Sequence, residues 1–137
     1  MTLQCQFCTA WNLVDPSRAR DRPVCGKCGR PILLDRPYPL TDESFKRTIA
    51  ESPLPVLVDF YADWCGPCKV MAPAVDALAA ARQGDALIAK MNTDFNPNTA
   101  REFQIQRIPT TIVFRNGVVA AQESSALTAK RLAELLG

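Results

Sequence analysis

The sequence predicts an α/β fold in which helices cover both faces of a mixed central sheet, preceded by a small cysteine-rich segment. From residue 41 onward, segments with helical spacing alternate with short β-branched and aromatic runs. A hairpin signal near residue 116 adds an antiparallel pair to strands otherwise joined by helices. The chain has 137 residues, and four of its six cysteines lie within the first 28. This length indicates one ordinary domain with an appendage.

Residues 1–36 form a candidate N-terminal domain that is too small to fold by apolar burial alone. They contain four cysteines, six basic residues, three aspartates and few aliphatic side chains. Below about 40 residues, a fold usually needs disulfides or a metal. Residues 37–40 contain two prolines, which favour a short, stiff linker. We therefore expect the second domain to span residues 41–137.

The second domain is expected to open with a helix and a central strand. Thr41 is a typical N-cap residue, and Phe45 and Ile49 lie four residues apart on one helical face. Residues 56–61 are nearly all apolar, which is typical of a strand covered on both faces. Asp59 is the one charged residue in that strand.

Three further elements follow. Residues 70–82 are rich in alanine and have helical spacing, with a kink expected at Pro73. Residues 86–91 are a second strand candidate, and residues 98–104 favour a short helix. The order of strands and helices implies a mixed sheet with helices on both faces.

The chain ends with a predicted hairpin and a helix. Strand candidates at 110–114 and 118–121 flank Asn116-Gly117, a strong signal for a tight hairpin turn. Thr128 is expected to cap the last helix, which has three leucines on one face. The hairpin supplies the antiparallel part of the mixed sheet.

Composition excludes several functional classes. Hydrophobic residues make up 47% of the chain and charged residues 22%, as in globular proteins. The net charge of +2 disfavours nucleic-acid or anionic-membrane partners. We find neither a secretory signal nor an apolar run long enough for a membrane span, and so expect a cytoplasmic monomer. Histidine is absent, which excludes Cys-His catalysis and mixed Cys/His metal sites.

Two Cys-x-x-Cys pairs in the N-terminal segment predict a metal site. The ligands would be Cys5, Cys8, Cys25 and Cys28, with 16 residues between the pairs. This spacing is typical of a zinc ribbon, because two tight turns aim four thiolates at one point. A four-thiolate site leaves no position for water, so we expect one structural Zn²⁺. Two disulfides, a redox dithiol set or an iron site with the same ligands remain as alternatives.

The third pair, Cys65-Gly66-Pro67-Cys68, is a candidate redox site. It follows the buried strand and precedes a helix. A sulfur at a helix N-terminus faces unpaired backbone N–H groups, which favour its thiolate. Pro67 suits the first turn, where its missing donor would be unpaired in any case.

From Thr41 to Leu136 the sequence resembles the thioredoxin family. The residues that carry the resemblance are DFYADWCGPCK at positions 59–69, Pro73, Lys90, Ile108-Pro109-Thr110 and Asn116-Gly117. The four-cysteine extension is similar to that of the bacterial zinc-containing type within the family. The resemblance implies a thioredoxin fold and thiol-disulfide exchange in electron transport, with no organic cofactor.

The resemblance also implies roles for single residues. Cys65 would be the exposed nucleophile, and Cys68, buried below it, would resolve the mixed disulfide. Asp59 would accept the proton of Cys68, with its pKa raised by burial. Lys90 would be the charge partner of Asp59.

The substrate would be bound by the loops around the cysteines. Pro109 would be a cis-proline beside the sulfurs, and Ile108 would offer backbone groups to an extended segment. Trp64, Gly66 and Pro67 would complete the binding surface. Ser124-Ser125 replaces a glycine usual in the family, which bears on the acceptance of substrates.

The expected partners are protein disulfides and a thioredoxin-reductase-like electron donor. A non-enzymatic module that binds partners through a zinc ribbon is the alternative from another functional class. A third hypothesis is zinc storage or redox sensing by release of the metal.

Overall fold

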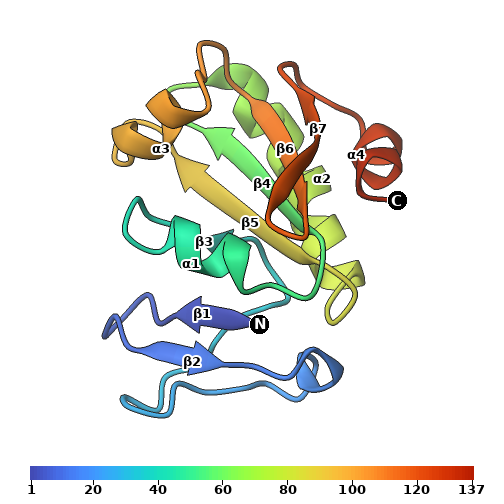
Figure 1. Cartoon of the computed structure of the whole chain (residues 1–137). Helices are drawn as coiled ribbons and strands as arrows, with labels where there is room; N and C mark the ends of the chain where they lie inside the picture. The colour runs from blue at the N-terminus through green and yellow to red at the C-terminus, as the bar shows by residue number, and fades with distance from the viewer.

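The computed structural model describes residues 1–137. Its centre is a five-stranded sheet with the order β3-β5-β4-β6-β7 (Figure 1). The strands are β3 (Tyr38–Pro39), β4 (Val56–Tyr61), β5 (Leu87–Asn92), β6 (Thr110–Arg115) and β7 (Val118–Glu123). The pairs β3·β5 and β4·β5 are parallel, whereas β4·β6 and β6·β7 are antiparallel. The predicted mixed sheet is confirmed.

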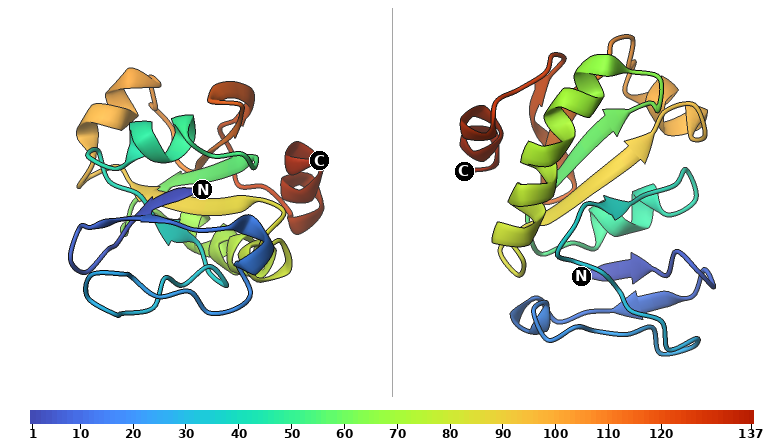
Figure 2. Two further views of the ribbon diagram at one scale, coloured as in Figure 1. Left: turned by 60° about the horizontal axis from the view of Figure 1, so that its bottom comes forward. Right: turned by 180° about the vertical axis from the view of Figure 1, so that it is seen from behind.

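Helices cover both faces of this sheet, as predicted (Figures 1 and 2). They are α1 (Phe45–Ala50), α2 (Gly66–Ala81), α3 (Pro97–Glu102) and α4 (Ala129–Leu136). On one face, Phe45 of α1 packs edge-on against Phe103 and Phe114, with ring centroids 5.4 and 5.6 Å away. On the other face, Met71 of α2 and Leu132 of α4 belong to a second apolar cluster. No helix combines the length and apolarity needed to cross a membrane.

Strand β4 is buried on both sides because its side chains alternate between the two clusters. Val58 and Phe60 belong to the α1 side, and Leu57 belongs to the α2 side. Asp59 has the same parity as Leu57, so its carboxyl lies on the side of α2. This strand therefore carries a buried charge toward the helix that begins at the redox pair.

The helix starts differ from the sequence predictions in two places. Helix α1 begins at Phe45, because Thr41 and Ser44 bond each other's backbone N–H groups at 3.1 and 3.0 Å and form a turn. Thr41 thus caps this turn through its side chain, as predicted, and α1 itself begins at Phe45 rather than directly after Thr41. Helix α2 begins at Gly66 and thus includes the second cysteine of the pair. The predicted cap at Thr128 is confirmed.

The segment expected to be a linker contains an edge strand. In β3, Tyr38 is the register partner of Ala89 and Pro39 that of Lys90. A proline is tolerated in an edge strand because its missing N–H would face solvent there. The backbone N–H of Leu40 then donates to the Lys90 carbonyl at 2.9 Å. Residues 37–40 thus belong to the central sheet.

The N-terminal segment packs against the edge of the sheet and α1 (Figure 1). It contains the antiparallel strands β1 (Thr2–Gln4) and β2 (Trp11–Leu13) and the 3-10 helix η1 (Pro16–Arg18). Leu3 and Val14 are buried in the same apolar cluster as Tyr38. The hydroxyl of Tyr38 also donates to the Gln4 carbonyl at 2.6 Å. As expected for so short a segment, its apolar residues are buried jointly with the larger part of the chain.

A second contact joins the N-terminal segment to the end of α2. Gly84 has φ +88°, and a Cβ atom there would lie 2.8 Å from the carbonyl oxygen of Pro16. The guanidinium of Arg20 donates to the Ala81 carbonyl at 3.2 Å. Both the conformation and the close approach require a glycine at this turn.

Candidate active site and metal centre

Cys65 and Cys68 form a disulfide at the N-terminus of α2, with their Cα atoms 5.3 Å apart. Cys65 is the N-cap residue in an extended conformation, and its Sγ accepts the backbone N–H of Cys68 at 3.2 Å. Gly66 and Pro67 occupy the first turn between them. The same N–H group and the positive end of the helix dipole would stabilise a Cys65 thiolate in the reduced form.

The two cysteines are equally buried in the disulfide form, whereas the family resemblance implies an exposed Cys65 as the attacking thiol. In this disulfide form Cys65 is 3% exposed and Cys68 4%. Cys65 is covered because its Sγ lies against the helix start and 3.7 Å from the Ile108 carbonyl oxygen. The two cysteines differ in their surroundings. Cys68 and Asp59 line one solvent-open cavity, and Cys65 does not line it.

Asp59 is buried in that cavity of about 260 Å³. Its Oδ1 has no hydrogen-bond partner. Loss of solvation raises the pKa of Asp59 to about 7. The positive charge of Lys90 lowers this pKa, and the negative charge of Asp76 raises it further. A carboxyl with this pKa exchanges protons near neutral pH, beside the sulfur of Cys68.

Lys90 lines the same cavity from the neighbouring strand. It is the register partner of Asp59 in the β4·β5 pair. Its Nζ lies 5.8 Å from the centroid of the Tyr61 ring, and the two side chains Asp59 and Lys90 form no ion pair within 4.0 Å. The lysine therefore acts on the carboxyl only through space.

The other predicted site residues surround the disulfide. The Ile108–Pro109 bond is cis, as expected, and Pro109 is buried. Trp64 is 70% exposed, and its Nε1 donates to the carboxylate of Asp94 at 2.9 Å. Gly66 has open space on its Cβ side and is exposed, so this glycine fills no steric need in the disulfide form.

Ser124 is linked to the cis-proline loop. Its hydroxyl accepts a hydrogen bond from Thr110 Oγ1 at 3.0 Å, directly after the cis-proline. Ser124 and Ser125 are both exposed.

Two residues near the active site were not predicted from the sequence. Asp94 holds Trp64, and Asp76 lines the cavity of Asp59. Asp76 lies eight residues after Cys68, so helical spacing places both on neighbouring parts of one helix face. No pattern in the sequence marks Asp94.

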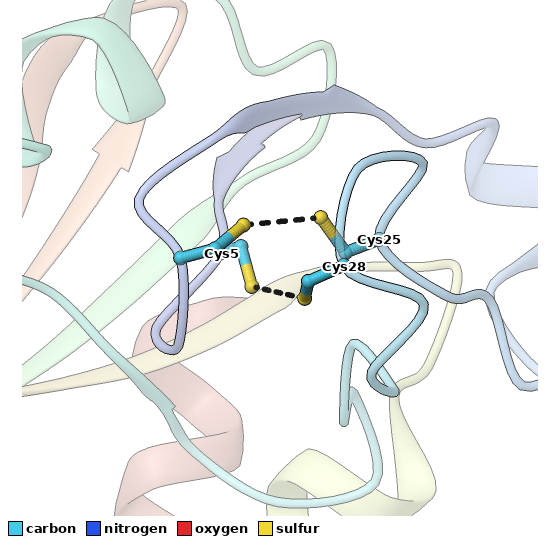
Figure 3. A group of neighbouring side chains, drawn as sticks. Cys5, Cys25 and Cys28 are labelled. Atoms are coloured by element: carbon cyan, nitrogen blue, oxygen red, sulfur yellow. Dashed lines mark hydrogen bonds between the residues drawn. The ribbon is translucent and has the colours of Figure 1, made fainter.

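The four N-terminal cysteines come together at one point, as predicted. Their Sγ atoms all lie within 4.8 Å of one another. Cys5 and Cys28 are 3.7 Å apart, and Cys8 and Cys25 are 3.6 Å apart (Figure 3). Four sulfurs at about 2.3 Å from a tetrahedral Zn²⁺ would be separated by about 3.8 Å. The four cysteines are therefore positioned to bind a metal ion, and their spacing fits zinc.

The two cysteine turns have the same hydrogen bonds to sulfur. The N–H of Phe7 donates to the Sγ of Cys5, and the N–H of Lys27 donates to the Sγ of Cys25, both at 3.4 Å. Each bond runs from the residue two positions after the first cysteine of its pair. These donors stabilise negative charge on sulfur, as metal-bound thiolates require.

The turns also end in the same backbone conformation. Thr9 has φ +64° and Gly29 has φ +76°, each directly after the second cysteine. Their N–H groups donate to the carbonyls of Cys5 and Cys25, each at 2.9 Å. The first pair lacks a glycine, and Thr9 adopts the left-handed conformation in its place.

Asn12 is a further residue of the metal centre that the sequence does not reveal. Its Nδ2 donates to the Sγ of Cys25 at 3.4 Å, and its Oδ1 accepts the N–H of Gly26 at 2.9 Å. The Cys28 backbone N–H and then this amide lower the pKa of the Cys25 thiol to about 6. Asn12 thus orients one ligand and fixes its turn.

The family model described as thioredoxin matches residues 36–137. The chain belongs to the thioredoxin family. As a thioredoxin with a Cys-x-x-Cys pair, it is a dithiol-disulfide oxidoreductase. Members of this family reduce protein disulfides with electrons from a reductase.

Several thioredoxins are similar to this one. A thioredoxin of Rickettsia conorii is 53% identical over 76 residues, which cover 56% of this chain and 72% of the relative. Thioredoxin C-3 of Corynebacterium nephridii is 35% identical over 136 residues, covering 99% of this chain and 93% of the relative. The second alignment therefore includes the cysteine-rich segment.

Among solved structures, a mutant thioredoxin from Halobacterium salinarum matches with a TM-score of 0.68 and 31% identity. The match covers 75% of this chain and 89% of that structure. The comparison confirms the thioredoxin fold.

Proposed function

We propose that this thioredoxin reduces protein disulfides through Cys65 and Cys68, with electrons from a thioredoxin-reductase-type donor. The observation that carries the assignment is the position of Cys65 as N-cap of α2, where its Sγ accepts the N–H of Cys68. In the dithiol form this contact favours the thiolate of Cys65, which is the attacking species.

The reaction has two exchange steps. The thiolate of Cys65 attacks one sulfur of a substrate disulfide, a Cys65–substrate disulfide forms, and the other substrate sulfur leaves with the electron pair. Cys68 then attacks Cys65, the internal disulfide forms, and the second substrate sulfur leaves as a thiolate. The substrate has gained two electrons, and the Cys65–Cys68 pair has lost them.

Asp59 is proposed as the acceptor of the Cys68 proton in the second step. Its buried carboxyl shares a cavity with Cys68 and has an oxygen without a hydrogen-bond partner. With a pKa of about 7, it is near the optimum for a general base at neutral pH. Lys90 across the strand pair would favour the ionised form.

The substrate would lie across the surface formed by the exposed residues around the disulfide. Trp64, Gly66 and Pro67 are exposed beside it, and Ile108 is half-buried. An extended peptide would pair with the backbone next to Pro109, which offers no N–H of its own. The serines at 124 and 125 would narrow this surface relative to a glycine.

We further propose that the N-terminal cysteines hold one Zn²⁺, as in the zinc-containing thioredoxins of the thioredoxin 2 type. Support comes from the four sulfurs within 4.8 Å and from the N–H donors to two of them. When bound, zinc would supply a structural cross-link, because four thiolates fill its coordination sphere. Thiols held for a metal require a reducing compartment, which favours the cytoplasm. We propose no organic cofactor.

The redox proposal is tested by reduction of insulin disulfides, coupled to NADPH oxidation through a thioredoxin reductase. We expect turnover by the full chain and its loss in both Cys65→Ser and Cys68→Ser. Asp85→Asn, an exposed substitution that lines neither the cavity of Asp59 nor the metal centre, serves as the control. Full activity of Cys65→Ser would overturn the assignment, and so would failure of the unaltered chain to turn over.

The metal proposal is tested by elemental analysis of protein purified without chelator. We expect one zinc per chain, lost in Cys5→Ser and Cys25→Ser and retained in Cys65→Ser. Protein that contains no zinc, or iron in its place, would refute the proposal.

A further inference from the structure

Two cavities meet beside Asp59. The inner one, of about 260 Å³, is lined by Asp59 and Cys68 and opens to solvent beside the exposed Asp63 and Lys69. A second one, of about 540 Å³, lies next to it, and both are lined by Pro37, Asp76 and Lys90. The outer cavity therefore adjoins the open pocket of Asp59 at these three residues.

The N-terminal segment forms part of the wall of this outer cavity. Gln6 and Phe7, which lie between the first two cysteines, line it, as do Leu33 and Arg36. Gln6 and Phe7 are exposed, so the cavity opens to solvent at the turn of the metal centre. In this chain the surroundings of the redox site include residues outside the thioredoxin domain.

Asp76 stands where the two cavities join. It is exposed on α2, opposite Lys90 of β5, and it forms no ion pair within the chain. Its negative charge contributes to the raised pKa of Asp59. A carboxylate here reaches both the inner cavity and solvent.

We propose that Asp76 is a positioning residue for proton transfer, standing with Lys90 at the outlet through which the proton of Asp59 reaches solvent, and that the N-terminal segment walls this outlet. The inference rests on the proposed role of Asp59. It adds a route by which the proton leaves and a function for the turn at Gln6 in that route.

The proton balance follows the second exchange step. Cys68 loses its proton to the Asp59 carboxylate as its sulfur bonds to Cys65. Asp59 can pass that proton to water or a buffer base in the cavities, and a proton returns to Cys68 when the disulfide is reduced again. The negative charge of Asp76 favours passage of the positive charge through the outlet.

Several titratable or charged groups face Asp59. They are Lys90 from β5, Cys68, Lys69 and Asp76 from α2, Tyr61 from the end of β4, and Asp63 from the turn that follows it. Asp76 is the carboxylate that also borders the outer cavity. Its removal therefore changes the outlet and leaves the cysteines and Asp59 in place.

The test compares Asp76→Asn with Asp85→Asn, an exposed aspartate that lines neither cavity. We measure the rate at which the mixed disulfide resolves, against pH and buffer concentration. For Asp76→Asn the pH midpoint should fall by about 0.5 unit, because a negative charge near Asp59 is lost. In dilute buffer its rate should fall roughly threefold, and imidazole should restore it. Asp85→Asn should behave as the unaltered protein.

The outcomes separate this inference from the function on which it rests. If Asp59→Asn leaves resolution unchanged, the proposed role of Asp59 is wrong. If Asp59→Asn slows resolution of the mixed disulfide but Asp76→Asn changes neither the pH midpoint nor the buffer dependence of that rate, the proposed proton outlet is wrong. Equal shifts in Asp76→Asn and Asp85→Asn would also overturn it, because charge at any distance would then suffice.

A second variant tests the wall without altering charge. Gln6→Trp enlarges a side chain at the outer cavity, and its zinc content shows whether the metal centre is intact. We expect the same buffer dependence as for Asp76→Asn, with an unchanged pH midpoint. A rate independent of buffer would show that the N-terminal segment does not border the route.

Discussion

Asp59 and Lys90 are register partners on the parallel strands β4 and β5, but their side chains form no ion pair within 4.0 Å. The carboxyl has lost its solvation without gaining a close partner, and one of its oxygens has no hydrogen bond. Its raised pKa and its cost to stability therefore have the same cause.

Asp59→Asn should stabilise the protein in a pH-dependent way. The pKa of Asp59 is about 7 in the folded state and about 3.9 when unfolded, so the folded state holds the proton more tightly. The stability of the unaltered protein therefore falls as pH rises from about 4 to 7. The advantage of Asn should grow across this window and reach about 2–4 kcal/mol above it. Urea unfolding at pH 4, 6 and 8 measures it, and a gain that is independent of pH would contradict the burial of the carboxyl.

The same substitution should slow the second exchange step. Without its acceptor, Cys68 gives up its proton less readily, so the mixed disulfide should persist. The deficit should shrink at higher pH, where hydroxide accepts the proton. Stopped-flow measurement separates this step from the first attack by Cys65, which should change less.

Cys68→Ser should trap substrates through Cys65. In the reduced protein, the N-cap position favours the Cys65 thiolate, so iodoacetamide should modify Cys65 much faster than Cys68 near neutral pH. The variant should then accumulate mixed disulfides that mass spectrometry assigns to Cys65. Cys65→Ser is the matched control, and faster labelling of Cys68 would reverse the two roles.

Thr9→Gly should stabilise the first cysteine turn. Thr9 has φ +64°, a conformation unfavourable for a β-branched residue, whereas Gly29 occupies the same place in the second turn. We expect a gain of about 1 kcal/mol, reduced by the freedom of glycine in the unfolded chain. Gly29→Thr is the reciprocal variant and should lose about 1–2 kcal/mol, because no atom lies within 4 Å of its Cβ position and only backbone strain changes. Equal stabilities of the unaltered protein, Thr9→Gly and Gly29→Thr would refute the backbone strain proposed at Thr9.

Deletion of residues 1–36 should leave a folded and redox-competent protein of lower stability. Residues 37–137 retain all five strands of the central sheet, including β3. The deletion removes the cover of Tyr38 and the acceptor of its hydroxyl. We expect a loss of about 2–4 kcal/mol in urea unfolding. Tyr38→Phe in the full chain should lower the free energy of unfolding by about 1 kcal/mol, which is the part due to the hydroxyl hydrogen bond. An unfolded deletion variant would show that the two parts of the chain fold only together.

Local patterns were enough to predict most elements of the thioredoxin domain. The apolar run at 56–61, Asn116-Gly117 and the cap at Thr128 each specify their structure through neighbouring residues, and each prediction is confirmed. The strand at Tyr38–Pro39 was missed because two prolines in a short segment resemble a connector. Its pairing with β5 depends on a contact between residues distant in sequence, as the register Tyr38↔Ala89 records.

The metal and redox motifs were predictable because their residues are close in sequence. The cysteine turns and the helix start at Cys65 have fixed spacing. The contacts of Asn12 and Asp76 arise from folding, and spacing does not specify them. Both redox cysteines are buried in the disulfide form, so the greater exposure of Cys65 as the reduced nucleophile stays a prediction.

Gly84 limits how freely the N-terminal extension can be exchanged between thioredoxins. The turn after α2 touches the Pro16 carbonyl so closely that any side chain there would displace η1. In a thioredoxin domain with another residue at this turn, the extension could not pack in the same position. Transplanting all of its cysteines would not change this. The extension is thus fitted to its own domain, and a chimera that carries it requires the glycine as well as residues 1–36.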